Sequence, residues 1–91
     1  MVVVILEKVP MGLRGELSRW MIEPKTGVFV GSISGMVRDR LWEKLCEASK
    51  GGSCVMIHSD NTEQGFSMRI FGEPSRRVVD FEGLLLIRVP L

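Results

Sequence analysis

The sequence predicts one α+β domain, with a mainly antiparallel sheet of four to five strands and two helices on one face of the sheet. Three observations support this prediction. The chain has 91 residues, which is the size of a single domain. Short apolar runs rich in β-branched residues alternate with two segments whose apolar residues recur at helical spacing. Two strand-like runs then follow each other across a polar turn, which is typical of a hairpin.

The first ten residues predict a buried strand that ends at a carboxylate. Val2–Leu6 is an uninterrupted apolar run, and its β-branched residues suit a pleated surface. Because apolar residues do not alternate with polar ones, we expect this strand at the centre of the sheet, covered on both faces. Glu7 lies where the strand leaves the core, and Pro10 ends the extended run. Glu7 is therefore either a solvated strand-end residue or part of a site.

Residues 10–22 predict the first helix. Their apolar residues recur at i, i+4, i+7 and i+8, which defines one helix face made of Leu13, Leu17, Trp20 and Met21. This spacing favours a core position for Trp20 over a base-stacking platform. Gly12 and Gly15 each cost about 1 kcal/mol in a helix interior, so either another backbone approaches closely there or the first turn is frayed. Pro24 is expected to end the helix with the residue before it.

A short strand and a second helix follow. Residues 27–31 form an apolar run between two glycines, and Ser34 then provides an N-cap. The helix is expected to end at Gly51 and Gly52, where a left-handed C-cap forms easily. Its apolar stripe consists of Val37, Leu41, Trp42, Leu45 and Cys46.

The second half of the chain predicts a hairpin and a last strand. Residues 53–59 and 66–71 are the two strands of the hairpin, joined by a polar turn. The domain spans 1–83, and its part after residue 71 is expected to be irregular and polar. The apolar run at 84–91 predicts a separate C-terminal strand.

The order of these elements is typical of a ferredoxin-like sandwich. Two helices can cover only one face of such a sheet. Yet the runs at 2–6, 28–30 and 55–57 are apolar on both faces. A second copy of the same sheet is the simplest cover for the other face, so we predict a homodimer with its sheets stacked face to face. On this pattern alone, a plain protein-interaction domain that dimerises through its sheet is one class of function.

Composition and charge restrict the classes of function further. The apolar fraction of 45% and the charged fraction of 25% are typical of a soluble globular protein. A net charge of +1 excludes a general polycation, so nucleic-acid binding would require a local basic patch. The N-terminal apolar run is too short to span a membrane and follows no basic leader, so we expect a cytoplasmic protein without a membrane partner. Cys46 and Cys54 fit no metal spacing and are expected to be reduced thiols. The single histidine, His58, is expected to be structural.

Seven short motifs occur in order along nearly the whole chain. They read Val-Val-Val-x-x-Glu-x-Val-Pro at 2–10, Leu-Arg-Gly-x-Leu at 13–17, Gly-Val-Phe-Val-Gly at 27–31, Arg-x-x-x-Trp-Glu at 38–43, Asn-Thr-Glu-x-Gly-Phe at 61–66, Phe-Gly-x-x-x-Arg-Arg at 71–77 and Val-Asp-x-x-Gly-Leu at 79–84. With these motifs the sequence resembles the small CRISPR-associated Cas-two family, in its type I-E form. The resemblance implies a ferredoxin-like homodimer.

The resemblance also implies a function in antiviral defence. In the family, the dimer lies between two dimers of the CRISPR integrase subunit, and the assembly inserts a captured DNA fragment into the CRISPR array as a new spacer. The integrase subunit carries the strand-transfer chemistry, and the small dimer bridges and measures the double-stranded DNA. We therefore expect a DNA-bridging structural subunit whose partners are its own second copy, the integrase subunit and DNA.

An alternative function follows from the same resemblance. The wider family includes metal-dependent endonucleases acting on RNA or DNA, whose catalytic residue is an aspartate at the end of the first strand. The matching position here is Glu7, a departure shared with the type I-E form. As a site, Glu7 would form a symmetric pair of carboxylates across the dimer axis that holds Mg²⁺ with waters and substrate phosphate. We prefer the interpretation that Glu7 is not catalytic. We expect Mg²⁺ as a cofactor only if the protein is a nuclease.

The candidate DNA contacts are arginines. Arg76 and Arg77 are paired in a polar segment, and the guanidinium fork matches phosphate oxygens without reading bases. Arg14 and Arg38 match basic positions of the family near the starts of the two helices. Two further positions that are basic in type I-E relatives are occupied here by Gly12 and Met36. The resemblance therefore implies that this protein binds DNA with fewer positive charges.

The C-terminal run is the candidate partner-binding segment. It is too apolar for a free tail, so it is either an edge strand of its own sheet or a strand that pairs outside the protomer. In the type I-E form this end contacts the partner, and we expect it to be exchanged with the other protomer or paired with the integrase subunit. The residues concerned are Leu84, Leu85, Leu86, Ile87, Arg88 and Val89.

Overall fold

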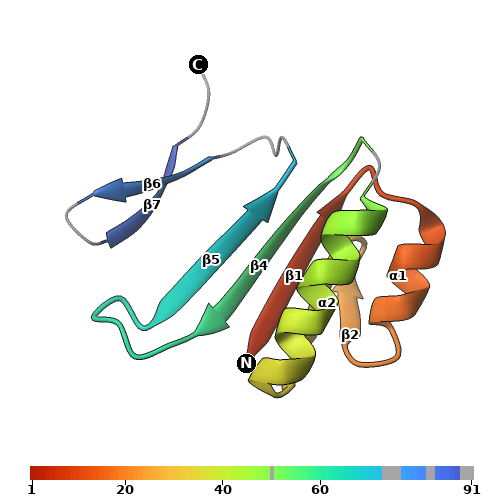
Figure 1. Cartoon of the computed structure of the whole chain (residues 1–91), viewed down its shortest axis with the longest axis horizontal. Coiled ribbons are helices and arrows are strands. Elements are labelled where there is room, and N and C mark those ends of the chain that lie inside the picture. Colours follow the sequence, from red (N-terminus) through yellow and green to blue (C-terminus); the bar gives the residue numbers. More distant parts are fainter. Residues whose placement is uncertain (50, 73–76, 82–83, 89–91) are drawn as a thin grey trace.

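The computed structural model describes residues 1–49, 51–72, 77–81 and 84–88 of the protein (Figure 1). Most strands and helices are joined by short connections. In chain order they are β1 (Val2–Glu7), α1 (Met11–Leu17), β2 (Ile22–Lys25), β3 (Val28–Gly31), α2 (Gly35–Ala48), β4 (Ser53–Ser59), β5 (Phe66–Phe71), β6 (Arg77–Phe81) and β7 (Leu84–Arg88).

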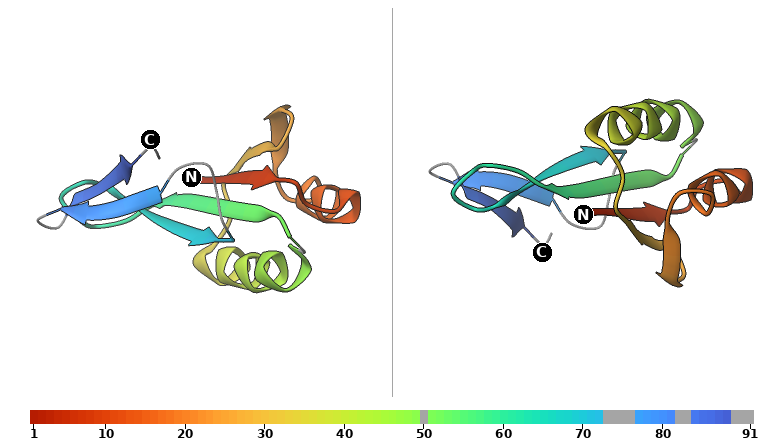
Figure 2. Two further views of the ribbon diagram at one scale, coloured as in Figure 1. Left: turned by 90° about the horizontal axis from the view of Figure 1, so that it is seen from above. Right: turned by 90° about the horizontal axis from the view of Figure 1, so that it is seen from below.

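The main sheet has five strands in the order β2-β3-β1-β4-β5, and every neighbouring pair is antiparallel. The predicted α+β architecture is therefore confirmed, with β1 at the centre of the sheet. The segment β1-α1-β2-β3-α2-β4 has the element order of a ferredoxin-like fold, in which a hairpin strand is inserted between two strands joined by a helix. Strands β6 and β7 form a second, two-stranded sheet. Figures 1 and 2 show this hairpin beyond β5, on the side away from α1.

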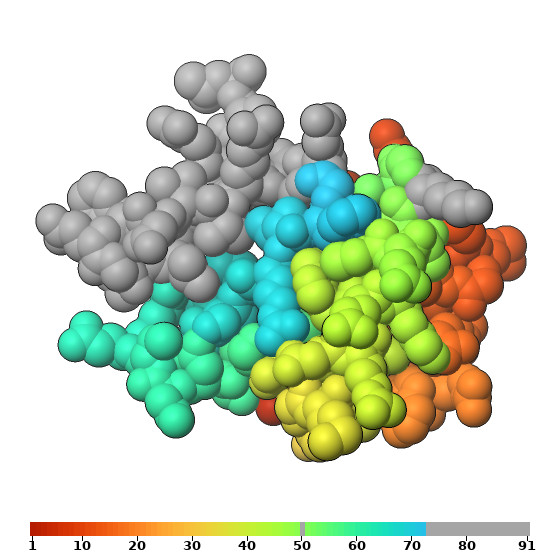
Figure 3. Space-filling view, in the orientation of Figure 1, coloured from red at the N-terminus to blue at the C-terminus, as the bar shows by residue number. Residues whose placement is uncertain are grey.

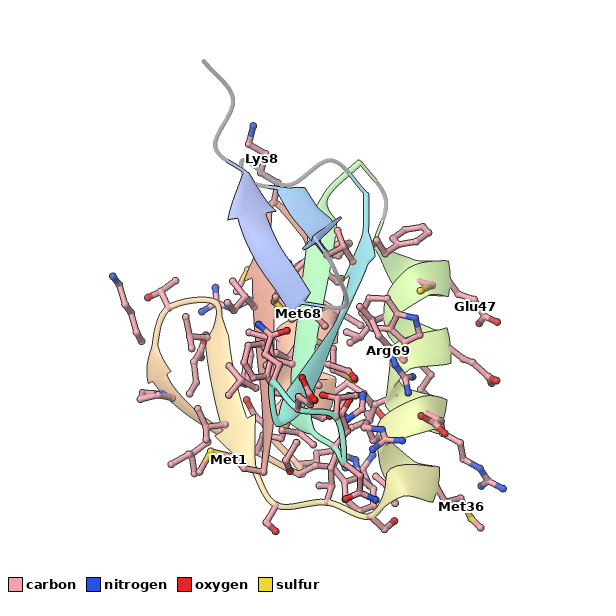
Figure 4. The ribbon with its side chains drawn as sticks, turned by 90° about the vertical axis from the view of Figure 1, so that its left-hand side faces the viewer. Met1, Lys8, Met36, Glu47, Met68 and Arg69 are labelled. Carbon is pink, nitrogen blue, oxygen red and sulfur yellow. The ribbon has the colours of Figure 1, made fainter. Side chains whose placement is uncertain are left out.

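One face of the main sheet carries the hydrophobic core. Alternate residues of β1 are buried there together with leucines from both helices, so the two helices cover the same face. Figure 4 shows α2 along this side of the strands. The core consists of Val2, Val4, Leu6, Leu13, Leu17, Met21, Phe29, Leu41, Leu45, Cys54 and Met56, with Trp42 packed against it.

Both cysteines are free thiols, as predicted. Cys54 is fully buried in β4 and Cys46 is partly buried in α2. Burial raises the pKa of both thiols, because it disfavours the charged thiolate.

The first helix is shorter than predicted. It ends at Leu17, and the next residues form turns in which the backbone N–H groups of Ser18 and Trp20 donate to carbonyls one turn back. Met21 is buried as expected, but Trp20 is 49% exposed, so its predicted core position is wrong. The prediction for Trp20 failed because the helical spacing of apolar residues continues past the end of the helix into a turn.

Strand β2 was not predicted, because Pro24 was expected only to end the helix. Proline is tolerated in an edge strand, where its missing N–H faces solvent, and β2 is the edge of the sheet. The β2–β3 turn depends on Gly27, whose φ of +82° suits glycine. A Cβ at Gly27 would lie 2.7 Å from the Leu6 carbonyl oxygen, so the turn also packs closely against β1.

The segment after β5 also differs from the prediction. Residues 72–83 were expected to be irregular, yet Arg77–Phe81 forms β6. It pairs antiparallel with β7, with Val79 opposite Leu86 and Arg77 opposite Arg88. The C-terminal strand was predicted, and β7 is that strand. Among the described residues it pairs with β6 and is not an edge strand of the main sheet.

The second face of the main sheet is also apolar, as the unalternating strands predicted. Val3 lies between Val30 and Ile57, and each of these side chains is half-buried although no helix covers them. Figure 4 shows that Met68 projects away from α2 while the next residue, Arg69, projects toward it. We call the apolar part of this surface the open face; it consists of Val3, Ile5, Ile22, Val28, Val30, Val55, Ile57, Phe66, Met68 and Ile70, and Lys25 of the edge strand lies opposite Val28 at its border.

No helix among the described residues is long and apolar enough to cross a membrane.

Candidate nucleic-acid interface

Glu7 is the last residue of β1 and its side chain is exposed. By the alternation of the strand it lies on the same face as Val3 and Ile5, at one end of the open face. Its cross-strand partner is Ser53 in β4. The predicted position of Glu7, where the strand leaves the core, is therefore confirmed.

A pocket of about 510 Å³ opens beside Glu7. The backbone is crowded around it, because a Cβ at Gly52 would lie 2.5 Å from the carbonyl oxygens of Glu7 and Lys8. Lys8 itself has a φ of +55°, a conformation that costs a non-glycine residue of the order of 1–3 kcal/mol. The polar and aromatic side chains that line the pocket are Glu7, Lys8, Ser49, Ser53 and Phe71.

Metal binding at Glu7 would need ligands from elsewhere. Within the described part of the chain, no group of three or more His, Cys, Asp or Glu side chains is placed to hold a metal ion. Magnesium can be held by one or two carboxylates with waters and substrate phosphates. The donor set of one protomer therefore fits Mg²⁺ only if a second copy or a phosphate group completes it.

Arg14, a predicted DNA contact, holds α1 to the β2–β3 turn. Its Nη2 donates to Glu23 Oε2 at 2.7 Å, and the backbone N–H of Gly27 donates to the same oxygen at 2.8 Å. Both hydrogen bonds lower the pKa of the Glu23 carboxyl group, and the bond from Gly27 has the larger effect. A DNA phosphate would therefore compete with Glu23 for the Arg14 guanidinium.

Arg38, the predicted contact at the start of α2, belongs to a cluster that spans three elements. Its Nε donates to Asp39 Oδ1 at 3.2 Å, and its Nη1 lies 3.3 Å from Nδ1 of the buried His58. Arg69 of β5 donates to the same Asp39 oxygen at 2.8 Å. Hydrogen bonds from Arg69 and then from Arg38 lower the pKa of Asp39. Two guanidinium groups thus converge on one exposed carboxylate.

Arg69 is a basic residue that the sequence alone did not single out. The sequence predicted residues 66–71 as a hairpin strand, but it could not say which face or which neighbours the polar positions of that strand would have. The register places Arg69 opposite Met56, on the helix-covered face and at its rim, where it meets Asp39 of α2. The structure brings Arg38 and Arg69 together, whereas Arg14 is bound to a different carboxylate.

The remaining predicted contacts lie in the C-terminal part. The backbone of Arg77 begins β6, where it pairs with Arg88, so two basic positions are cross-strand neighbours at one end of the hairpin. Leu84–Arg88 is strand β7. Arg76 and Val89 lie outside the described residues. Contact of these residues with DNA or a partner stays a prediction.

The fold and the site together define a small α+β protein with a five-stranded antiparallel sheet, an apolar sheet face opposite the two helices, and basic residues near the helix starts and in the C-terminal hairpin. A family described as CRISPR-associated protein (Cas_Cas2CT1978) matches residues 1–86. The chain belongs to this family of CRISPR-associated proteins, which confirms the Cas-two resemblance at the level of the family.

Proposed function

We propose that the protein is the DNA-bridging subunit of the complex that inserts new spacers into a CRISPR array, as in the type I-E form. In this proposal two copies form a homodimer, which binds double-stranded DNA and the CRISPR integrase subunit in the cytoplasm. Membership of the CRISPR-associated family is the observation that carries the proposal. The glutamate at position 7, a departure that the type I-E form shares, supports that form.

The open face supports the homodimer. Its two rows of cross-strand neighbours run from β3 through β1 and β4 to β5 without a charged residue: Val30, Val3, Ile57 and Met68, and Val28, Ile5, Val55 and Ile70. An apolar surface this continuous is characteristic of an interface. In a two-fold symmetric dimer the same patch of both copies forms the interface. A second copy would therefore bury the open face without any other partner.

The experiment that tests the proposal is reconstitution with the integrase subunit encoded beside it. Both proteins are co-expressed, and the purified complex is given a duplex fragment and a plasmid carrying the CRISPR repeat. We expect insertion of the fragment at the repeat only when both proteins are present. Insertion at the same rate and site by the integrase subunit alone would contradict a bridging role.

Glu7→Ala is expected to leave insertion within about twofold of wild type, because one carboxylate per protomer lacks further metal ligands among the described residues. The insertion assay on the assembled complex measures this rate. An integrase variant without its catalytic residues serves as the negative control. Loss of insertion with the Glu7→Ala complex still assembled would show that this carboxylate takes part in the reaction.

Replacing both Arg76 and Arg77 by alanine is expected to weaken the salt dependence of DNA binding by the complex. Each phosphate contact contributes about 0.9 to the slope of log K against log salt, so two lost contacts lower it by up to about 1.8 per protomer. Fluorescence anisotropy of a labelled duplex, at salt concentrations between roughly 50 and 300 mM, measures this slope.

A matched control for this prediction removes the same charge elsewhere. Arg19 and Lys25 have exposed side chains outside the predicted DNA path, and their double alanine variant also loses two positive charges. An equal slope for wild type and the Arg76/Arg77 variant would remove these arginines from the DNA path. An equal decrease of the slope in both double variants would mean that Arg76 and Arg77 act only through the net charge of the protein.

A second candidate function is a Mg²⁺-dependent endonuclease acting on RNA or DNA. The observation that favours it is the exposed Glu7 beside the pocket of about 510 Å³, with Lys8 on the same rim. Glu7 and its symmetry mate would hold the ion and Lys8 would bind a phosphate. Cleavage that disappears both with EDTA and in Glu7→Ala would establish this function.

A further inference from the structure

Another pocket lies between the end of α1 and the side of α2, and none of the proposed DNA contacts lines it. Its volume is about 240 Å³. From α2 come Val37, Arg40, Leu41 and Lys44, at the i, i+3, i+4 and i+7 positions of one stripe, and Trp20 closes the pocket from the turn after α1. Figure 3 shows α1 and α2 side by side on this face of the molecule.

The lining combines an aromatic ring, apolar walls and two cations. Trp20 is 49% exposed, although its helical spacing predicted a core position. Arg40 has no ion pair with any residue that the structure describes. Lys44 Nζ lies 3.2 Å from Glu16 Oε1, but the lysine side chain is 62% exposed, so this surface pair is weak and can exchange partners.

We propose that this pocket is a contact site for single-stranded nucleic acid, in which one unpaired base stacks on Trp20 and the phosphates beside it bind Arg40 and Lys44. Stacking on an aromatic side chain next to cations that follow the backbone is how proteins hold single strands without reading sequence. The inference goes beyond the duplex bridging proposed above, because it concerns other residues and another form of the nucleic acid.

The size and chemistry of the pocket favour this occupant. Pockets for complete small-molecule ligands usually measure about 300–1,000 Å³, so this one suits a single base rather than a larger ligand. A base inside a duplex is stacked on both sides and cannot reach Trp20 without being unpaired. A purely acidic peptide could bind Arg40 and Lys44 but would leave Trp20 without a stacking partner, whereas a single strand supplies a ring and flanking anions together.

The test uses the purified full chain without the integrase subunit. The sequence has two tryptophans, so a Trp42→Phe background leaves Trp20 as the only tryptophan fluorophore. Titration with the oligonucleotide octathymidylate is expected to quench this fluorescence. In anisotropy measurements with labelled octathymidylate, Trp20→Ala is expected to weaken binding roughly tenfold.

The cations are tested in the same assay. Arg40→Ala with Lys44→Ala is expected to lower the salt slope by about 1.4, since each single-strand phosphate contact contributes about 0.7. Arg19→Ala with Lys25→Ala loses the same charge from exposed positions that do not line the pocket, and it is expected to change the slope by much less. Circular dichroism of every variant checks that the fold is retained.

Three results would overturn the inference: no binding of octathymidylate by wild type, equal binding by wild type and Trp20→Ala, or quenching of Trp20 by a blunt eight-base-pair duplex that is as strong as the quenching by octathymidylate. Quenching of Trp20 by the acidic peptide Glu-Glu-Phe-Glu-Glu but not by octathymidylate would instead assign the pocket to a protein partner. Because the integrase subunit is absent, failure here and failure of the spacer-insertion assay are independent results.

Discussion

Ile57→Glu is expected to prevent the proposed homodimer from forming and to leave a monomer of 10.2 kDa. Ile57 lies in the middle of the open face, between Val3 and Met68 on the neighbouring strands. In a face-to-face dimer each copy would bury a carboxylate against apolar side chains, and an unpaired buried charge costs several kcal/mol. A rise of at least about 100-fold in the dimer dissociation constant follows, since each tenfold corresponds to about 1.4 kcal/mol. Light scattering after size exclusion at micromolar concentration measures the mass.

The control for this prediction is the same chemical change at a position away from the open face. Met36 is 68% exposed at the start of α2, so Met36→Glu adds an equal charge in place of a similarly apolar residue. It is expected to leave the dimer intact. In the monomer the carboxylate introduced by Ile57→Glu would be solvated, because no helix covers this face, so the variant should still fold. A monomeric wild type, or a dimeric Ile57→Glu protein, would contradict dimerisation through the open face.

Removing residues 84–91 is expected to abolish the proposed complex with the integrase subunit and to leave the proposed homodimer intact. Strand β7 pairs with β6 in a sheet of its own, and neither strand belongs to the five-stranded sheet that carries the core and the open face. The deletion therefore takes no residue from the main sheet or its core. Size exclusion of the co-expressed proteins measures the complex, and light scattering of the truncated protein alone measures its dimer.

A finer version of this experiment uses the register of the hairpin. Successive positions of a strand alternate between its two faces, so Leu84 and Leu86 occupy positions on one face of β7 while Leu85 and Ile87 occupy positions on the other. Serine substitutions at one pair and then at the other should show which face contacts the partner, because only one double variant is expected to lose the complex. A full complex with the truncated protein would rule out β7 as the partner-binding segment.

The surroundings of Glu23 could not be predicted from the sequence. Its neighbour Pro24 was expected only to end the first helix, which in fact already ends at Leu17. The chain nevertheless continues as strand β2, where Glu23 accepts hydrogen bonds from Arg14 and from the backbone of Gly27. That carboxylate lies nine residues from Arg14 in sequence, and the ion pair exists only because the β2–β3 hairpin folds back beside α1.

The sequence by itself determined the elements whose patterns are local. The unalternating Val2–Leu6 run predicted a central strand with two apolar faces, and the stripe of α2 predicted its buried leucines. The seven ordered motifs determined the family. Such features depend on periodicity and on residue type, which are visible without knowing what lies opposite.

Only the tertiary structure decided which residues meet. Trp20 continues a helical spacing, but the helix ends before it, so the ring lies in a pocket with Arg40 and Lys44 rather than in the core. Arg69 joins Arg38 on Asp39 because the β4–β5 register carries it to the rim of the helix-covered face. Packing and strand register bring distant residues together, and neither is encoded in the spacing of a single segment.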